Sequence, residues 1–216
     1  MDKKLVKNYI YNIAYQIVKL FLPFFLVKYT YAHIGESTLG INDFASNISQ
    51  WFILFGILGV NTYGNREIAK VRDNRKELSK NFFEILSMQF INMMIVTVLY
   101  IFYILFFVKD NIIIYYLICF SMLSSAFDIS WFYYGVEDFR IVSIRNIVVK
   151  IVGVMLIFMF VKTPSDLWIF TLINSATDFI GQIITFLGLK KYIDKVPFSV
   201  KEAYKHHFAG TFALFV

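Results

Sequence analysis

The chain has 216 residues, of which 58% are hydrophobic, and its formal net charge is +6. Soluble domains are about 45–50% apolar, so this excess excludes an ordinary water-soluble protein and predicts one that lies in a lipid bilayer. The single cysteine, Cys119, excludes a disulfide framework and a cysteine-based metal site.

Long apolar segments follow one another along the chain. Crossing the hydrocarbon core takes roughly 20 helical residues. Six segments approach or exceed that length, at residues 9–31, 38–60, 82–107, 112–134, 143–161 and 167–189. A seventh apolar stretch, residues 208–216, is cut short. We therefore predict an all-α membrane protein, in which residues 1–207 form one six-helix transmembrane bundle and residues 208–216 are the truncated start of a second bundle.

The basic residues predict how the chain is oriented. If the N-terminus is cytoplasmic, the cytoplasmic segments hold seventeen Lys and Arg residues, whereas the opposite side holds only Lys109 and Lys162. This bias is typical of a multi-pass protein of the cytoplasmic membrane. The net charge therefore reports topology and does not indicate a nucleic-acid partner.

The first span carries a polar stripe. Asn12, Gln16 and Lys19 are spaced at i, i+4 and i+7, and Pro23 continues the line on the same helix face. A mid-span lysine costs roughly 2.5–3.5 kcal/mol on insertion scales, so Lys19 is expected to face a wet cavity or to snorkel toward the headgroups. Pro23 removes a helical hydrogen bond and is a candidate hinge.

Polar residues also mark other spans. Asn174 and Asp178 lie on one face of the sixth span, Asp128 lies in the fourth and Asp43 in the second. Ser, Thr, Asn and Gly commonly hold membrane helices together, whereas acids at membrane depth are functional candidates. We expect these four residues to line a cavity, where each acid pairs with Lys19, exchanges a proton or binds a cation.

Motifs for nucleotide or metal chemistry are absent from the sequence. It contains no P-loop, Gly-rich dinucleotide fingerprint, HExxH or GxSxG pattern. The adjacent His206 and His207 stand among lysines and are weak evidence for a metal. We therefore expect no catalytic residue, metal site or cofactor, with coupling to protons or sodium ions left open.

Two segments resemble a known family. Residues 63–72, YGNREIAKVR, resemble the YGxREIAxxR junction of bacterial polysaccharide flippases of the Wzx/RfbX type. Residues 128–140, DISWFYYGVEDFR, followed by Arg145-Asn146 and Lys150, resemble that family's aromatic-Gly-acidic stretch between helices four and five. The resemblance covers essentially the whole chain in helix order. Members usually have twelve or more helices, so the chain looks like the N-terminal half only.

The resemblance implies a fold and a function. The fold is that of the multidrug/oligosaccharidyl-lipid/polysaccharide exporters, in which two six-helix bundles enclose a central cavity. Members translocate undecaprenyl-diphosphate-linked oligosaccharide units across the cytoplasmic membrane by alternating access, for surface polysaccharide biosynthesis. The implied partners are the lipid-linked oligosaccharide, membrane lipid, a polysaccharide polymerase and the chain-length machinery.

A diphosphate cargo needs fixed positive partners when it leaves water. Lys19 is the first candidate for a phosphate contact. Arg66, Arg140, Arg145 and Lys150 are candidates at the cytoplasmic mouth, although the motif positions Arg66 and Arg145 would serve folding equally well.

Three other functions stay open. A cation-coupled multidrug exporter of the same fold would have an acid-dominated cavity, and Lys19 argues against it. A membrane polysaccharide polymerase or glycosyltransferase would need a sizeable loop with catalytic groups, and the short outer connections argue against an enzyme. The last alternative is an assembly partner that does not itself transport.

Overall fold

The computed structural model describes residues 3–215. Within the first helix, it describes the side chains of residues 13, 16, 17, 20–22 and those from 24 onward. The described chain is helical and has no strand. Its elements are α1 (Lys3–His33), α2 (Glu36–Ile57), α3 (Val60–Val71), α4 (Arg75–Phe107), α5 (Ile112–Ala126), α6 (Ser130–Gly135), α7 (Phe139–Phe160), η1 (Pro164–Asp166), α8 (Leu167–Phe186), η2 (Leu189–Lys191) and α9 (Val200–Ala213).

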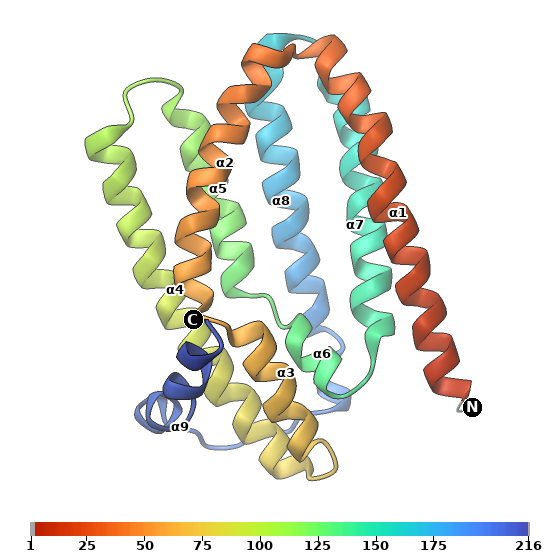
Figure 1. The fold of residues 1–216 in the computed structure, drawn as a ribbon, viewed down its shortest axis with the longest axis vertical. Helices are drawn as coiled ribbons and strands as arrows, with labels where there is room; N and C mark the ends of the chain where they lie inside the picture. The colour runs from red at the N-terminus through yellow and green to blue at the C-terminus, as the bar shows by residue number, and fades with distance from the viewer. Residues whose placement is uncertain (1–2, 216) are drawn as a thin grey trace.

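The long helices form one bundle. Helix α8 packs between α5 on one side and α7 on the other, α1 covers α7, and α2 packs on α4 and α5 (Figure 1). The short helices α3 and α6 and the helix α9 lie together at one end of the bundle, where α3 contacts α6 and α9 contacts α4 (Figure 1). We call this the charge-rich end.

The prediction of a multi-pass membrane protein is confirmed. Five segments of the described chain are long and apolar enough to cross a membrane: Glu36–Val71, Arg75–Phe107, Ile112–Gly135, Phe139–Phe160 and Pro164–Lys191. The first predicted span, residues 9–31, lies within α1, where many side chains fall outside the described residues.

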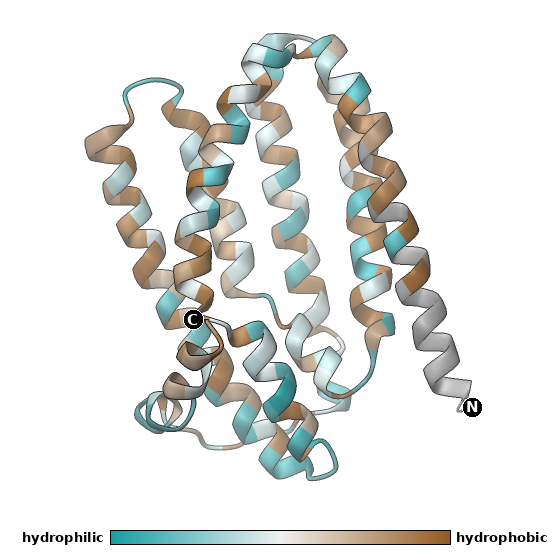
Figure 2. Cartoon of the chain, in the orientation of Figure 1, coloured by the Kyte–Doolittle hydropathy of each residue, from teal (hydrophilic) through white to brown (hydrophobic). Residues whose placement is uncertain are grey.

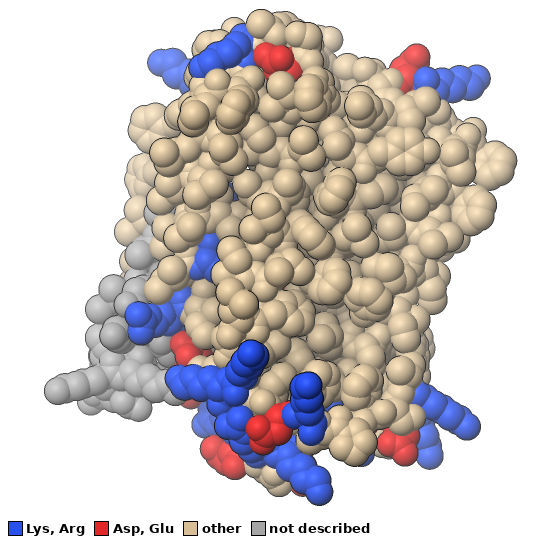
Figure 3. All heavy atoms as spheres, turned by 180° about the vertical axis from the view of Figure 1, so that it is seen from behind, with Lys and Arg blue, Asp and Glu red and all other residues tan. Residues whose placement is uncertain are grey.

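The surface agrees with a membrane setting. Apolar residues are spread along the long helices (Figure 2), and many of their large apolar side chains are exposed. Most Lys and Arg side chains in Figure 3 gather at the two ends of the bundle. In water, so many exposed apolar side chains would be unfavourable, whereas in a bilayer they contact lipid chains.

The predicted span 112–134 is two helices, α5 and α6, rather than one. Gln89 of α4, which is 1% exposed, stabilises the break between them. Its amide nitrogen donates to the carbonyls of Ser125 (2.9 Å) and Asp128 (3.0 Å), and its amide oxygen accepts from the Trp131 indole (2.9 Å). Helix ends leave carbonyls without partners, and lipid supplies none, so this buried amide replaces the missing bonds.

The segment between the second and third predicted spans is helical except for residues 72–74. After α2 the chain turns through Leu58 and Gly59, which both have positive φ, and α3 begins directly. Helix α4 then begins at Arg75, earlier than expected, because the Asn74 side chain accepts hydrogen bonds from the backbone of residues 76 and 77. Residues 208–213 belong to α9, which begins at Val200, and the domain boundary at residue 207 stays a prediction.

The two motif segments pack against each other through close contacts between α3 and α6. A β-carbon on Gly64 would lie 2.7 Å from the Trp131 ring. A β-carbon on Gly135 would lie 2.6 Å from the Ile68 β-carbon and 2.9 Å from the Asn65 carbonyl oxygen. Only glycine permits this approach. These motif glycines therefore serve the fold.

The Gly135→Ala variant is expected to lower the free energy of unfolding by about 1–3 kcal/mol, because the Asn65 carbonyl is backbone and cannot move aside. Thermal unfolding of the purified protein in detergent measures the effect. The control is Gly40→Ala on α2, where a β-carbon would meet nothing within 4 Å. It should leave the stability unchanged or raise it, since alanine is the better helix former. Equal losses in the two variants would contradict the prediction.

Candidate functional site: a charged cavity between α2, α5, α7 and α8

A cavity of about 270 Å³ lies inside the bundle. Four helices line it, and most of the lining side chains are polar or charged. They are Gln50 and Ile53 of α2, Ser121, Ser124 and Ser125 of α5, Arg145, Asn146, Val149 and Lys150 of α7, and Asp178 and Gln182 of α8. A polar cavity of this kind among membrane-spanning helices marks a site for a hydrophilic or charged group.

Arg145 is the most buried charge in the cavity, at 8% exposed. Its guanidinium donates to the Ser130 hydroxyl (3.0 Å) and to the Gln182 side-chain oxygen, while Nε has no hydrogen-bond partner. Its Cδ atom would lie 3.2 Å from a β-carbon on Gly181, so the glycine makes room for the arginine stem between α7 and α8. Neutral groups therefore orient Arg145, and no described carboxylate forms an ion pair with it.

Lys150 and Asp178 complete the charges of the cavity. Both side chains are exposed to it, and neither forms an ion pair within 4 Å with another described residue. Two cations therefore face one carboxylate in this cavity. A cleft lined by an excess of one sign of charge attracts ligands of the opposite sign, so the cavity favours an anionic ligand.

The other acids and the amide predicted for the cavity do not line it. Asp43 is exposed on α2. Asp128 lies in the break before α6, where its Oδ1 accepts from the Ser130 backbone N–H (2.9 Å). Asn174 donates to the Phe170 carbonyl of its own helix (3.0 Å). A functional role for these three residues stays a prediction.

The predicted stripe on α1 is described only in part. Gln16 is exposed on α1, and the side chains of Asn12, Lys19 and Pro23 lie outside the described residues. The helix backbone is continuous through residue 23. The cavity and hinge roles of these residues therefore stay predictions.

The four basic residues predicted at the cytoplasmic mouth do not form one cluster. Arg145 and Lys150 line the cavity, Arg66 is exposed on α3, and Arg140 lies beside a separate groove along α7 and α8. The sequence did not predict that Gln182 orients Arg145. The available signal was that Gln182 lies on the flank of the polar face of the sixth predicted span, residues 167–189.

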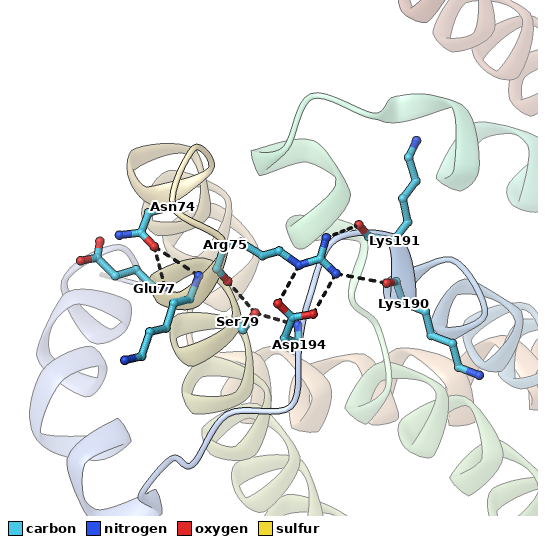
Figure 4. A network of polar contacts seen from close by, with 8 residues as sticks. Asn74, Arg75, Glu77, Ser79, Lys190, Lys191 and Asp194 are labelled. Atoms are coloured by element: carbon cyan, nitrogen blue, oxygen red, sulfur yellow. Dashed lines mark hydrogen bonds and ion pairs between the residues drawn. The ribbon is translucent and has the colours of Figure 1, made fainter.

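A polar network ties the segment after α8 to the start of α4 (Figure 4). The Arg75 guanidinium donates to both carboxylate oxygens of Asp194 (2.8 and 2.9 Å) and to the Lys191 carbonyl (3.0 Å). The Ser79 hydroxyl accepts from the Asp194 backbone N–H (2.9 Å). The Arg75–Asp194 ion pair is half exposed and adds little stability. Its bidentate geometry specifies the path of the chain after α8.

Comparison with known proteins places the chain in a family. The model of the family described as "Polysaccharide biosynthesis protein" matches residues 5–215. The chain belongs to this polysaccharide biosynthesis protein family. It is 22% identical, over 216 residues, to a protein of Escherichia coli (strain K12) named "Putative O-antigen transporter". The match covers 97% of this chain and 51% of the relative, so the chain spans about half the length of that curated relative. No solved structure matches the chain.

The family confirms the resemblance to polysaccharide flippases of the Wzx/RfbX type. The printed name of the relative describes that protein as a transporter. The charged cavity lies within the segment that the family model matches, so it is the candidate site of a polysaccharide biosynthesis family member.

Proposed function

We propose that this chain is part of a transporter that moves undecaprenyl-diphosphate-linked oligosaccharide units across the cytoplasmic membrane for surface polysaccharide biosynthesis. The observation that carries the proposal is the cavity with Arg145 and Lys150 inside a membrane bundle. The family membership and the name of the relative support the same class of cargo.

The chemistry of the cavity suits a diphosphate. Arg145 offers a planar fork that matches phosphate oxygens, and its orientation by Ser130 and Gln182 reduces the entropy lost on binding. Lys150 adds a second positive charge on the same helix. Gln50 and Gln182 offer amides to sugar hydroxyls. Two cations against one acid favour this cargo over the cationic drugs of a multidrug exporter.

The proposal includes a topology. Helix α1 also spans the membrane, in addition to the five segments given above. The N-terminus is cytoplasmic, and the charge-rich end faces the cytoplasm, in agreement with the positive-inside bias. In this arrangement the bundle is one lobe, and a second lobe completes the cavity during alternating access.

A strain that lacks its own flippase tests the function. The full-length protein should restore surface polysaccharide, detected by gel electrophoresis of cell-envelope extracts, without lowering the accumulation of cationic dyes. Lower dye accumulation without restored polysaccharide would instead establish a drug exporter. Failure to restore polysaccharide in a strain that makes the matching precursor would overturn the proposal.

A further inference from the structure

A groove of about 470 Å³ runs along α7 and α8, on the side away from the charged cavity. Ile144 and Val148 line the groove, whereas Asn146 and Lys150 line the cavity. These pairs are two positions apart, which is about 200° around a helix, so they face opposite sides of α7. Arg145 lies between the two sides and lines both.

The walls of the groove are apolar and face the surrounding bilayer. Ile144 is 38% exposed, Val148 is 51% exposed and Ile184 of α8 is 47% exposed. All three lie within membrane-spanning segments. A bilayer places hydrocarbon chains against such a surface, so the groove is suited to an acyl chain.

The rim of the groove at the charge-rich end is basic. Arg140 and Lys191 line it, together with one acid, Asp138. The Asp138 carboxylate already accepts a hydrogen bond from the Tyr192 hydroxyl. Burial, followed by this hydrogen bond, raises the pKa of Tyr192, so the hydroxyl remains a donor at neutral pH. Among the described residues that line this rim, two are therefore basic and one is acidic.

We propose that this groove binds an anionic phospholipid of the cytoplasmic leaflet, with its phosphate at Arg140 and Lys191 and one acyl chain along Ile144, Val148 and Ile184. Basic pockets between membrane helices on the cytoplasmic side bind anionic headgroups in this manner. The inference rests on the orientation given under the proposed function. It assigns Arg140 to a lipid site, apart from the cargo cavity.

Native mass spectrometry of the full-length protein, titrated with phosphatidylglycerol or phosphatidylcholine, tests the charge preference. Phosphatidylglycerol should bind about thirtyfold more tightly than phosphatidylcholine. The double variant Arg140→Ala/Lys191→Ala should lose that preference. The control is Lys201→Ala/Lys205→Ala, which removes two exposed lysines of α9 and should keep the preference. Equal binding of the two lipids by the unaltered protein would overturn the inference.

A second variant tests the acyl-chain wall. Val148→Trp fills the groove and should weaken phosphatidylglycerol binding with the rim intact, whereas Met159→Trp, at an exposed position of α7 outside the groove, should not. Displacement of phosphatidylglycerol by a polyprenyl phosphate would assign the groove to the cargo and overturn the inference. Binding is measured without transport, so a protein that binds phosphatidylglycerol but does not export polysaccharide would overturn only the proposed function.

Discussion

The Arg145→Ala variant is expected to bind a lipid-linked diphosphate about 10- to 100-fold more weakly and to lose most polysaccharide export. A hydrogen bond to a charged group contributes about 1.5–3 kcal/mol, and each 1.4 kcal/mol is a factor of ten in affinity. The effect is large because Arg145 is the buried cation of the cavity, and Ser130 and Gln182 already hold its guanidinium in place. Binding of a fluorescent undecaprenyl diphosphate to the full-length protein in nanodiscs measures the loss.

Two further variants, one at Arg145 and one at a distant lysine, separate the effect of charge from that of guanidinium geometry. Arg145→Lys keeps the charge but cannot reproduce the planar fork, so it should bind with intermediate affinity. Lys109→Ala, at an exposed position, removes one positive charge far from the cavity and should bind like the unaltered protein. Unchanged binding by folded Arg145→Ala protein would remove Arg145 from the site.

The His207→Ala variant is expected to lower the free energy of unfolding by about 3–5 kcal/mol and to release α9 from α4. Glu84 of α4 is 1% exposed, and its Oε2 lies 3.0 Å from His207 Nε2. The other ring nitrogen of His207 lies 2.9 Å from the Tyr63 hydroxyl of α3. Without the imidazole, the buried carboxylate would keep only two more distant and more exposed neighbours, Lys80 Nζ at 3.7 Å and His206 Nδ1 at 3.9 Å.

Hydrogen exchange of α9 and thermal unfolding measure this effect. The matched control is His206→Ala, because that side chain is 50% exposed and lies 3.9 Å from the same carboxylate. The His206→Ala variant should lower the free energy of unfolding by less than about 1 kcal/mol. Replacing both Glu84 and His207 with leucine should recover much of the loss, because no buried charge is then left unpaired. Equal destabilisation by the two single histidine variants would rule out the buried pair as the cause.

The helices could largely be predicted from the sequence, and the exceptions have a common cause. The span 82–107 appears within α4 and the span 167–189 within α8 and η2, because long apolar runs favour helices in lipid. The span 112–134 is broken into two helices, because Gln89 of α4 hydrogen-bonds the carbonyls at the break. The sequence of the fourth span alone does not contain this partner. Helix α3 occupies residues 60–71 before the expected third span, and it packs on α6 through Gly64 and Gly135.

Individual residues of the candidate site could be predicted from the sequence, but their arrangement in one cavity could not. The sequence marked Asp178 as a cavity residue and Arg145 and Lys150 as basic residues at the mouth. The expected span began at residue 143, which put Arg145 at its edge. Helix α7 begins at Phe139, so Arg145 is carried deeper into the bundle, where it meets Gln182.

Composition and periodicity alone determined that this protein lies in a membrane, that it is helical and that its charges are unequally divided between its two ends. These properties follow from transfer free energies and from the helical repeat, which act on neighbouring residues. Only the tertiary structure decided which polar groups meet. Glu84 and His207 are 123 positions apart, and Arg145 and Gln182 are 37 apart. Such pairs depend on how the helices pack, because packing brings distant side chains within hydrogen-bond distance.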